Sequence, residues 1–258
     1  AVLDLGPQPV AQLLVARAQR FAGASRRGFA VTLAAPAVRD QWWFADGEVG
    51  EGVAERYSIY NPGEEDVEVT AALLGVESTD FVPIDPIEVP RGQVVTFTPS
   101  DVDGVPQGRH AMVFGTQALD ARVVIERSLT RTFDGLATTS VTMGAPPRFD
   151  DGYVATTWTM AYGVDEPTED AMVVYNIDAQ DAVVTVQAVA PDGIVNVPGL
   201  EALELPANGL LTVDLTDDAA LDRQLIVRST SRVFVERLLP REAGAQGRVA
   251  SWPLPAAG

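Results

Sequence analysis

The sequence predicts an all-β protein made of tandem immunoglobulin-like or fibronectin-like β-sandwiches. Three observations support this fold class. Apolar residues alternate instead of recurring at helical spacing, turn-forming residues interrupt them at short intervals, and the same landmarks occur twice about 110 residues apart. At 258 residues the chain is long enough for two domains of ordinary size.

Alternation is clearest in D-V-E-V-T-A-A-L, where Val67 and Val69 fall on one face and Glu68 on the other. The segment V-V-T-V-Q-A-V, which begins at Val183, repeats the pattern. A period of two residues is typical of half-buried strands. We therefore expect roughly seven or eight short strands in each repeat.

The turns between these strands have an identifiable mechanism. In N-P-G-E, Pro62 presets φ, Gly63 tolerates a positive φ, and the side chain of Asn61 can bond the turn backbone. The second copy keeps the asparagine, Asn176, in the different turn N-I-D-A. We therefore interpret Asn61 as a turn residue and not as a binding residue.

The repeat is defined by four landmarks that recur in one order. Their separations are 115 residues for Trp43 and Trp158, 115 for Asn61 and Asn176, 116 for Val89–Phe97 and Leu205–Val213, and 110 for Ala121–Arg127 and Ser231–Arg237. Tandem modules explain this order and small drift. We expect Trp43 and Trp158 to be buried at equivalent positions of the two modules, and Tyr60 and Tyr175 to be buried in the same way.

A third, partial copy begins the chain, because Leu13–Pro36 resembles Val123–Pro146 at a separation of 110. The predicted organisation is thus residues 1–36 as closing strands of a preceding repeat, module 1 over 37–146 and module 2 over 147–258. We expect residues 1–36 to dock on module 1; the alternative is completion by upstream residues or a partner chain. The junction is predicted within Gly144–Gly152.

Composition excludes several functions. The net charge is −18 and every basic residue is an arginine, so nucleic acid and anionic lipid are poor partners. The absence of cysteine removes thiol catalysis and cysteine-ligated zinc. No apolar run approaches the roughly 20 residues that span a bilayer. The chain begins at Ala1 without a methionine or a basic leader, which indicates a processed or truncated sequence.

No catalytic, cofactor-binding or metal-binding residue is predicted. His110 is the single histidine, and we expect it on the surface of a strand. Asp101 and Asp103 lack the spacing and distal glutamate of a calcium loop, although calcium binding by acidic loops stays open. The dipeptides Glu126-Arg127 and Glu236-Arg237 place their side chains on opposite strand faces, so each charge needs a partner on a neighbouring strand.

The segments W-W-F-A-D-G, Y-N-P-G, V-I-E-R and G-A-P-P resemble a repeat of uncharacterised exported proteins of the actinobacterial envelope. Module 1 matches this pattern better than module 2, where W-T-M-A-Y-G replaces the first segment, and Ala16 stands where the other copies have glutamate. The resemblance implies an extracytoplasmic protein of the wall or membrane surface, without an established activity. A membrane association would come only from an anchor upstream of this chain.

Two functions are consistent with this interpretation. The first is a non-enzymatic scaffold, spacer or interaction module of the bacterial cell envelope that contacts another envelope protein. The alternative is a carbohydrate-binding module for cell-wall polysaccharide. Because adjacent Trp42 and Trp43 must point to opposite faces of a strand, Trp42 is the candidate for an exposed glycan or partner contact.

Overall fold

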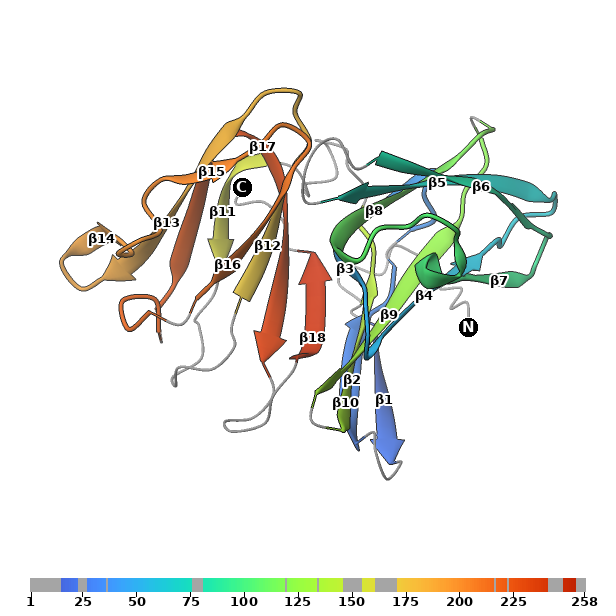
Figure 1. Cartoon of the computed structure of the whole chain (residues 1–258), viewed down its shortest axis with the longest axis horizontal. Coiled ribbons are helices and arrows are strands. Elements are labelled where there is room, and N and C mark those ends of the chain that lie inside the picture. Colours follow the sequence, from blue (N-terminus) through green and yellow to red (C-terminus); the bar gives the residue numbers. More distant parts are fainter. Residues whose placement is uncertain are drawn as a thin grey trace, which may run out of the picture.

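A computed structural model of the chain confirms the all-β class (Figure 1). Apart from one turn of 3-10 helix, η1 (Pro99–Asp101), the regular elements among the described residues are β-strands. The structure describes residues 15–22, 27–35, 37–75, 81–118, 120–133, 135–145, 155–160, 171–215, 217–221, 223–240 and 248–253.

Module 1 consists of two four-stranded antiparallel sheets that enclose a core. The first sheet has the order β3 (Gln41–Val49), β8 (Gly108–Thr116), β5 (Val67–Gly75), β6 (Phe81–Val89), and the second has the order β10 (Leu136–Met143), β9 (Val124–Phe133), β4 (Val53–Tyr60), β7 (Val94–Phe97). Burial alternates along β5 as its sequence period predicts. Both sheets supply core side chains, among them Phe44, Tyr57, Phe114 and Ile125.

Module 2 encloses a second core with one branched eight-stranded sheet. Its strands are β11 (Ala155–Met160), β12 (Ala171–Asn176), β13 (Ala182–Ala190), β14 (Gly193–Asn196), β15 (Leu203–Leu205), β16 (Leu210–Asp214), β17 (Leu225–Pro240) and β18 (Arg248–Pro253). The long strand β17 pairs first with β11 and β13 and later with β12 and β18. Trp158 and Val227 are among the buried residues of this core.

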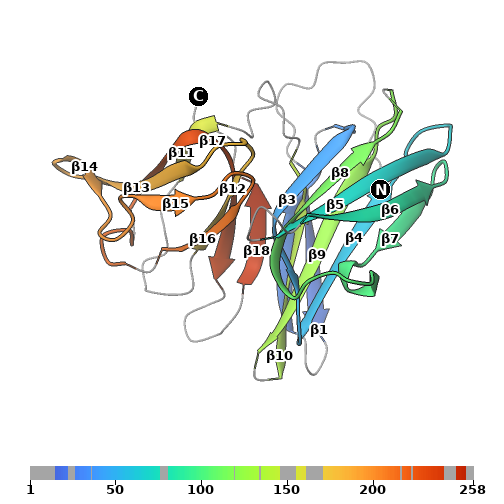
Figure 2. The same cartoon turned by 45° about the horizontal axis from the view of Figure 1, so that its top comes forward.

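The N-terminal hairpin, β1 (Ala16–Ala22) with β2 (Arg27–Leu33), forms a separate two-stranded sheet. It is equivalent in sequence to the hairpins β9–β10 and β17–β18, and these three closing hairpins meet in space. Strand β10 packs against β2 and β18, and β2 also contacts β18, between the two modules in Figures 1 and 2. The described part of residues 1–36 therefore lies against the closing strands of both modules. Of the predicted junction, residues 146–152 lie outside the described residues.

The repeat extends to individual hydrogen bonds in the turns. Asn61 is fully buried, its Nδ2 donates to the carbonyls of Glu65 (2.8 Å) and Val89 (3.0 Å), and its Oδ1 accepts from the Gly63 amide. Asn176 does the same in module 2, with donation to the carbonyls of Gln180 and Pro206 and acceptance from the Asp178 amide. The asparagines thus close equivalent turns, despite the different residues that follow them.

The predicted burial of the aromatic residues is right for Trp158 and Tyr175 and wrong for their module 1 counterparts. Trp42, not Trp43, enters the module 1 core, and Tyr60 is only half-buried. Of two adjacent tryptophans in a strand only one can face the core, and sequence alignment selected the other. Trp43 instead packs against Tyr175 of module 2, with ring centroids 5.3 Å apart.

Candidate functional site

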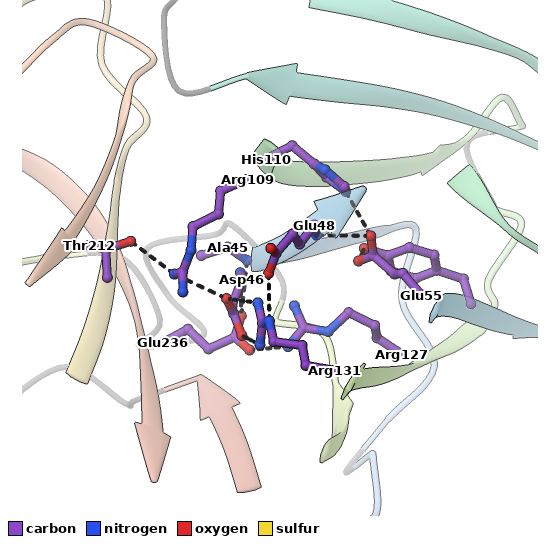
Figure 3. A network of polar contacts seen from close by, with 11 residues as sticks. Ala45, Asp46, Glu48, Glu55, Arg109, His110, Arg127, Arg131, Thr212 and Glu236 are labelled. Carbon is purple, nitrogen blue, oxygen red and sulfur yellow. Dashed lines mark hydrogen bonds and ion pairs between the residues drawn. The ribbon is translucent and has the colours of Figure 1, made fainter. Parts of the chain in front are cut away.

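The most distinctive chemical feature of the molecule is a charged cluster where module 1 meets module 2 (Figure 3). It lies beside an apolar contact in which side chains from both modules are buried together. The buried members of this contact are Ala45, Ala111, Ala145, Ala171, Val173, Tyr175, Leu210, Phe234 and Leu238. We call the charged residues Asp46, Glu48, Glu55, Arg109, His110, Arg127, Arg131 and Glu236 the inter-module ionic cluster.

A β-bulge in β3 creates the first part of the cluster. The register of β3 against β8 shifts between Phe44 and Gly47, so Ala45 and Asp46 have no ladder partner on β8. Their amides point instead at Glu236 on β17, whose Oε2 accepts from Ala45 N at 3.0 Å and Asp46 N at 3.2 Å. Backbone donors of module 1 are thereby satisfied by a carboxylate of module 2.

The same carboxylate forms an ion pair with Arg127 of β9. Its Oε1 accepts from Arg127 Nη2, and the exposed fractions of the two side chains are 1% and 0%. Burial lowers the pKa of Arg127, but the nearby Glu236 and Asp46 carboxylates raise it above its ordinary value. The guanidinium also lies over the ring of Phe44, with Cζ 5.6 Å from the centroid. This ion pair is therefore fully removed from water.

Asp46 is the centre of a second set of ion pairs. Its carboxylate accepts two hydrogen bonds from Arg131, at 2.8 and 3.2 Å, and one from Arg109 at 3.4 Å. Arg131 also reaches Glu48 at 2.5 Å. Burial raises the pKa of Asp46, but the guanidinium groups of Arg131, Arg127 and Arg109 outweigh it and hold the pKa below the ordinary value. The buried carboxylate is therefore ionised.

A third contact crosses between the modules through Arg109 of β8. The Nη1 atom of Arg109 donates to Thr212 Oγ1 of β16 at 2.9 Å while it also approaches Asp46. Figure 3 shows this side chain extending from module 1 toward the strands of module 2. One arginine thus joins the charged centre of module 1 to the sheet of its neighbour.

His110 belongs to the same cluster and is buried, so our expectation from the sequence that it lies on the surface of a strand is wrong. His110 is 1% exposed, and its Nε2 lies 2.9 Å from Glu55 Oε2. Glu55 also accepts from Tyr57 Oη at 2.6 Å, and burial followed by the charge of Glu55 raises the pKa of this phenol. A Cβ at Gly47 would lie 2.4 Å from His110 Nε2, so only glycine fits beside the imidazole.

The ion pair between β9 and β17 has an equivalent one repeat earlier. Arg17 of β1 pairs with Glu126 of β9 at 2.7 Å, and both residues lie 110 positions before Arg127 and Glu236. In both pairs an arginine of one closing strand contacts the glutamate of the next closing strand. Because Glu126 and Arg127 point to opposite faces of β9, this dipeptide links module 1 both to the preceding hairpin and to module 2.

Chemically, the cluster is arranged to hold two bodies together. Most of its charges are buried, and they neutralise one another through direct hydrogen bonds. Among the described residues, no group of three or more histidine, aspartate or glutamate side chains is placed to hold a metal ion. No helix in the described part is long and apolar enough to cross a membrane. Because Glu236 and Arg109 make their hydrogen bonds and ion pairs across the junction, we interpret the cluster as a clasp between the modules.

The structure removes the candidate glycan contact. Trp42 is 2% exposed in the module 1 core, and its indole Nε1 donates to the Val123 carbonyl at 2.9 Å. A buried ring offers no face on which a sugar can stack. The sequence analysis also predicted that Glu126, Arg127 and Glu236 need charged partners on neighbouring strands. The structure gives these partners, because Glu126 pairs with Arg17 and Arg127 pairs with Glu236.

Asp46, Arg109 and Arg131 were missed by sequence reasoning. The one available signal was the occurrence of D-G inside a strand, at Asp46-Gly47, where a charged residue and a glycine interrupt an apolar run. Such an interruption is typical of a bulge, but it does not reveal which residues satisfy the charge.

Comparisons with known proteins give no family for this chain. No family model matches it, and no curated protein matches it. Among solved structures it is similar to Thermotoga maritima 1070, with 20% identity over 41% of this chain and 92% of that chain and a TM-score of 0.36. It is also similar to a putative secreted protein from Parabacteroides distasonis ATCC 8503, with 11% identity over 92% and 85% of the two chains and a TM-score of 0.21. With TM-scores below 0.5, neither similarity supports a conclusion about the function of this chain.

Proposed function

We propose that the protein is a non-enzymatic β-sandwich scaffold of the bacterial cell envelope, which acts as a rigid spacer and presents its edges and loops to another envelope protein. The observation that carries this proposal is the buried contact of Glu236 with Arg127 and with the amides of Ala45 and Asp46. A spacer must keep its modules at a fixed angle, and this contact favours one angle strongly.

The reason lies in the cost of buried charge. If the modules rotated apart, Glu236 and Arg127 would lose their partner in a region from which water is excluded, and two amides would lose their acceptor. The apolar contact around Tyr175 and Phe234 adds attraction, but apolar surfaces tolerate sliding. The ionic cluster supplies the orientation that the apolar contact lacks.

The envelope location is supported by the resemblance of W-W-F-A-D-G, Y-N-P-G, V-I-E-R and G-A-P-P to repeats of exported actinobacterial proteins. The acidic surface agrees with a protein that avoids nucleic acid and anionic lipid, since its charge of −18 repels both. Labelling of intact and permeabilised cells of the source organism with an antibody against this chain tests the location. Signal only after permeabilisation would contradict the proposal.

Small-angle scattering tests the rigid arrangement. We expect the unchanged chain to fit one fixed arrangement of the modules. Thr212→Val removes the hydroxyl contacted by Arg109 and should increase the spread of module separations, whereas Thr185→Val, at an exposed hydroxyl of module 2, should not. A scattering curve of the unchanged chain that required a broad range of separations would contradict a rigid spacer.

A further inference from the structure

The junction between the modules joins two different faces of a β-sandwich. Module 1 contributes the outer side of its β3–β8–β5 sheet, where Trp43 and Leu74 lie, and we call this side the receiving face. Module 2 contributes the outer side of β16, β12 and β17, where Leu210, Tyr175 and Phe234 lie, and we call this side the presenting face. Because the joined faces differ, the contact is heterologous, and every further contact of this kind needs one face of each type.

Module 1 has a presenting face of its own at equivalent positions. In module 2 the centre of this face is a row of three cross-strand neighbours, which are Leu210 on β16, Tyr175 on β12 and Phe234 on β17. The residues with the same pairing in module 1 are Val94 on β7, Tyr60 on β4 and Val124 on β9. The row of module 2 is buried, whereas Val94 is 59% exposed and the other two residues of its row are half-buried. Val94 is thus exposed where its counterpart is covered by the neighbouring module.

The receiving face of module 2 also carries exposed apolar residues. Here β11, the first half of β17 and β13 take the places of β3, β8 and β5. Val189 of β13 lies 115 residues after Leu74 of β5, and each of the two follows a fully buried residue of its strand. Leu74 packs in the apolar contact with module 2, but Val189 is 38% exposed. Its cross-strand neighbour on β14, Ile194, is 53% exposed.

The junction itself shows what fits these two faces, because there a receiving face covers a presenting face. We propose that copies of this chain associate head to tail, with the receiving face of module 2 in one copy against the presenting face of module 1 in the next. Val94 then takes the place of Leu210, and Val189 takes that of Leu74. A heterologous contact continues from copy to copy unless its rotation closes a ring. The partner is thus a second copy of this chain.

The contact between copies lacks the ionic part of the junction. The aspartate of W-W-F-A-D-G is replaced by tyrosine in W-T-M-A-Y-G of module 2, and Glu126 beside the presenting face of module 1 already pairs with Arg17. Apolar burial is then the main attraction, and the net charge of −18 on each copy opposes it. We therefore expect reversible association that strengthens as salt screens this repulsion.

This inference deepens the proposed function, on which it rests, because it names the partner that the scaffold would hold. The two can fail separately. A rigid spacer on the cell surface could remain a monomer, and a chain that associates head to tail could have flexible modules.

The first test is sedimentation of the full chain over a wide range of protein and salt concentrations. We expect the average mass to increase with concentration beyond that of a dimer. Val94→Asp and Val189→Asp should each weaken association at least about tenfold, because each places a carboxylate in the apolar contact. Val38→Asp is the matched control, since this valine is 39% exposed and lies on neither face, and it should leave association unchanged. Circular dichroism checks that all three variants fold.

A mixture of the two variants tests the head-to-tail arrangement. Val94→Asp leaves the receiving face of module 2 intact, and Val189→Asp leaves the presenting face of module 1 intact. One productive contact is therefore available between a copy of each variant, although neither variant has a complete pair of faces. We expect each variant alone to remain largely monomeric, and an equimolar mixture to form dimers of one copy of each and nothing larger.

Three outcomes would overturn the proposal. The first is a monomer at every protein and salt concentration. The second is a symmetric dimer, shown by a mass of the unchanged chain that stops at two copies or by failure of the mixed variants to associate. The third is association that appears only after residues 1–12 are deleted, because the chain would then cover its own face.

Discussion

Replacement of Glu236 by alanine tests the clasp most directly. The change removes the anionic partner of Arg127 and the acceptor for the amides of Ala45 and Asp46, all at a position that is 1% exposed. What remains is a buried guanidinium whose charge is no longer compensated at short distance. We therefore expect the damage to come from the groups left behind and not from the loss of a few carbon atoms.

Removal of one partner from a buried ion pair costs about 3–5 kcal/mol of unfolding free energy, and we expect Glu236→Ala to fall in this range. The repeat provides a matched control in Glu126→Ala. The same residue type at the equivalent position pairs there with Arg17, which is half exposed, so solvent screens the loss. Exposed pairs are worth about 0–1 kcal/mol. The two substitutions should therefore differ by at least about 2 kcal/mol.

Urea unfolding followed by circular dichroism and tryptophan fluorescence measures both values, with the free energy extrapolated linearly to zero denaturant. Glu236→Gln is a useful third variant, because its amide oxygen still accepts from the backbone while the charge is lost, and we expect an intermediate effect. Equal losses for Glu236→Ala and Glu126→Ala would refute the reasoning, since burial would then not decide the strength of the pair.

Three further predictions follow from single residues. The folded-state pKa of Asp46 is held below the ordinary value of 3.8, so its ionised form adds to the free energy of unfolding above about pH 4, and this contribution is lost as the pH falls further. Asp46→Asn should therefore flatten the acid side of a plot of unfolding free energy against pH. An unchanged slope would contradict this. Asn61→Ala and Asn176→Ala leave buried carbonyls without donors, so each should cost about 2–3 kcal/mol in urea unfolding, and losses that differ greatly would show that the two turns are not equivalent. Trp42→Ala should lower the free energy of unfolding by roughly 3–5 kcal/mol and Trp43→Ala by clearly less, because only the ring of Trp42 fills the module 1 core. Thermal unfolding of both variants measures this difference. A larger loss for Trp43→Ala would contradict the burial of Trp42.

The all-β class and the repeated turns could be predicted because they depend on local pattern. Alternation along Val67–Gly75 needs only the two-residue period of a strand, and the turn role of Asn61 needs only the geometry of its neighbours. The long strand β17 could not be predicted, since it pairs with β13 early and β12 late, and this change of partner depends on tertiary packing.

The ionic cluster was only half predictable for the same reason. A strand places Glu126 and Arg127 on opposite faces, so the need for two separate partners follows from sequence alone. The identity of those partners does not. Glu236 is distant along the chain, and the amides that it binds are available only because the bulge at Ala45 and Asp46 breaks the ladder. A bulge of this kind is a property of two paired strands and not of one segment.

The dipeptide Glu-Arg therefore acts as a connector because of strand geometry. On β9 the glutamate faces Arg17 of the preceding hairpin and the arginine faces Glu236 of the following module. Two adjacent residues with opposite charge and opposite direction are enough to repeat this link from one closing strand to the next. A chain of such links fixes each module relative to its neighbours, and the strength of each link depends on how completely its two side chains are buried, which is full for Arg127 and Glu236 and partial for Arg17 and Glu126.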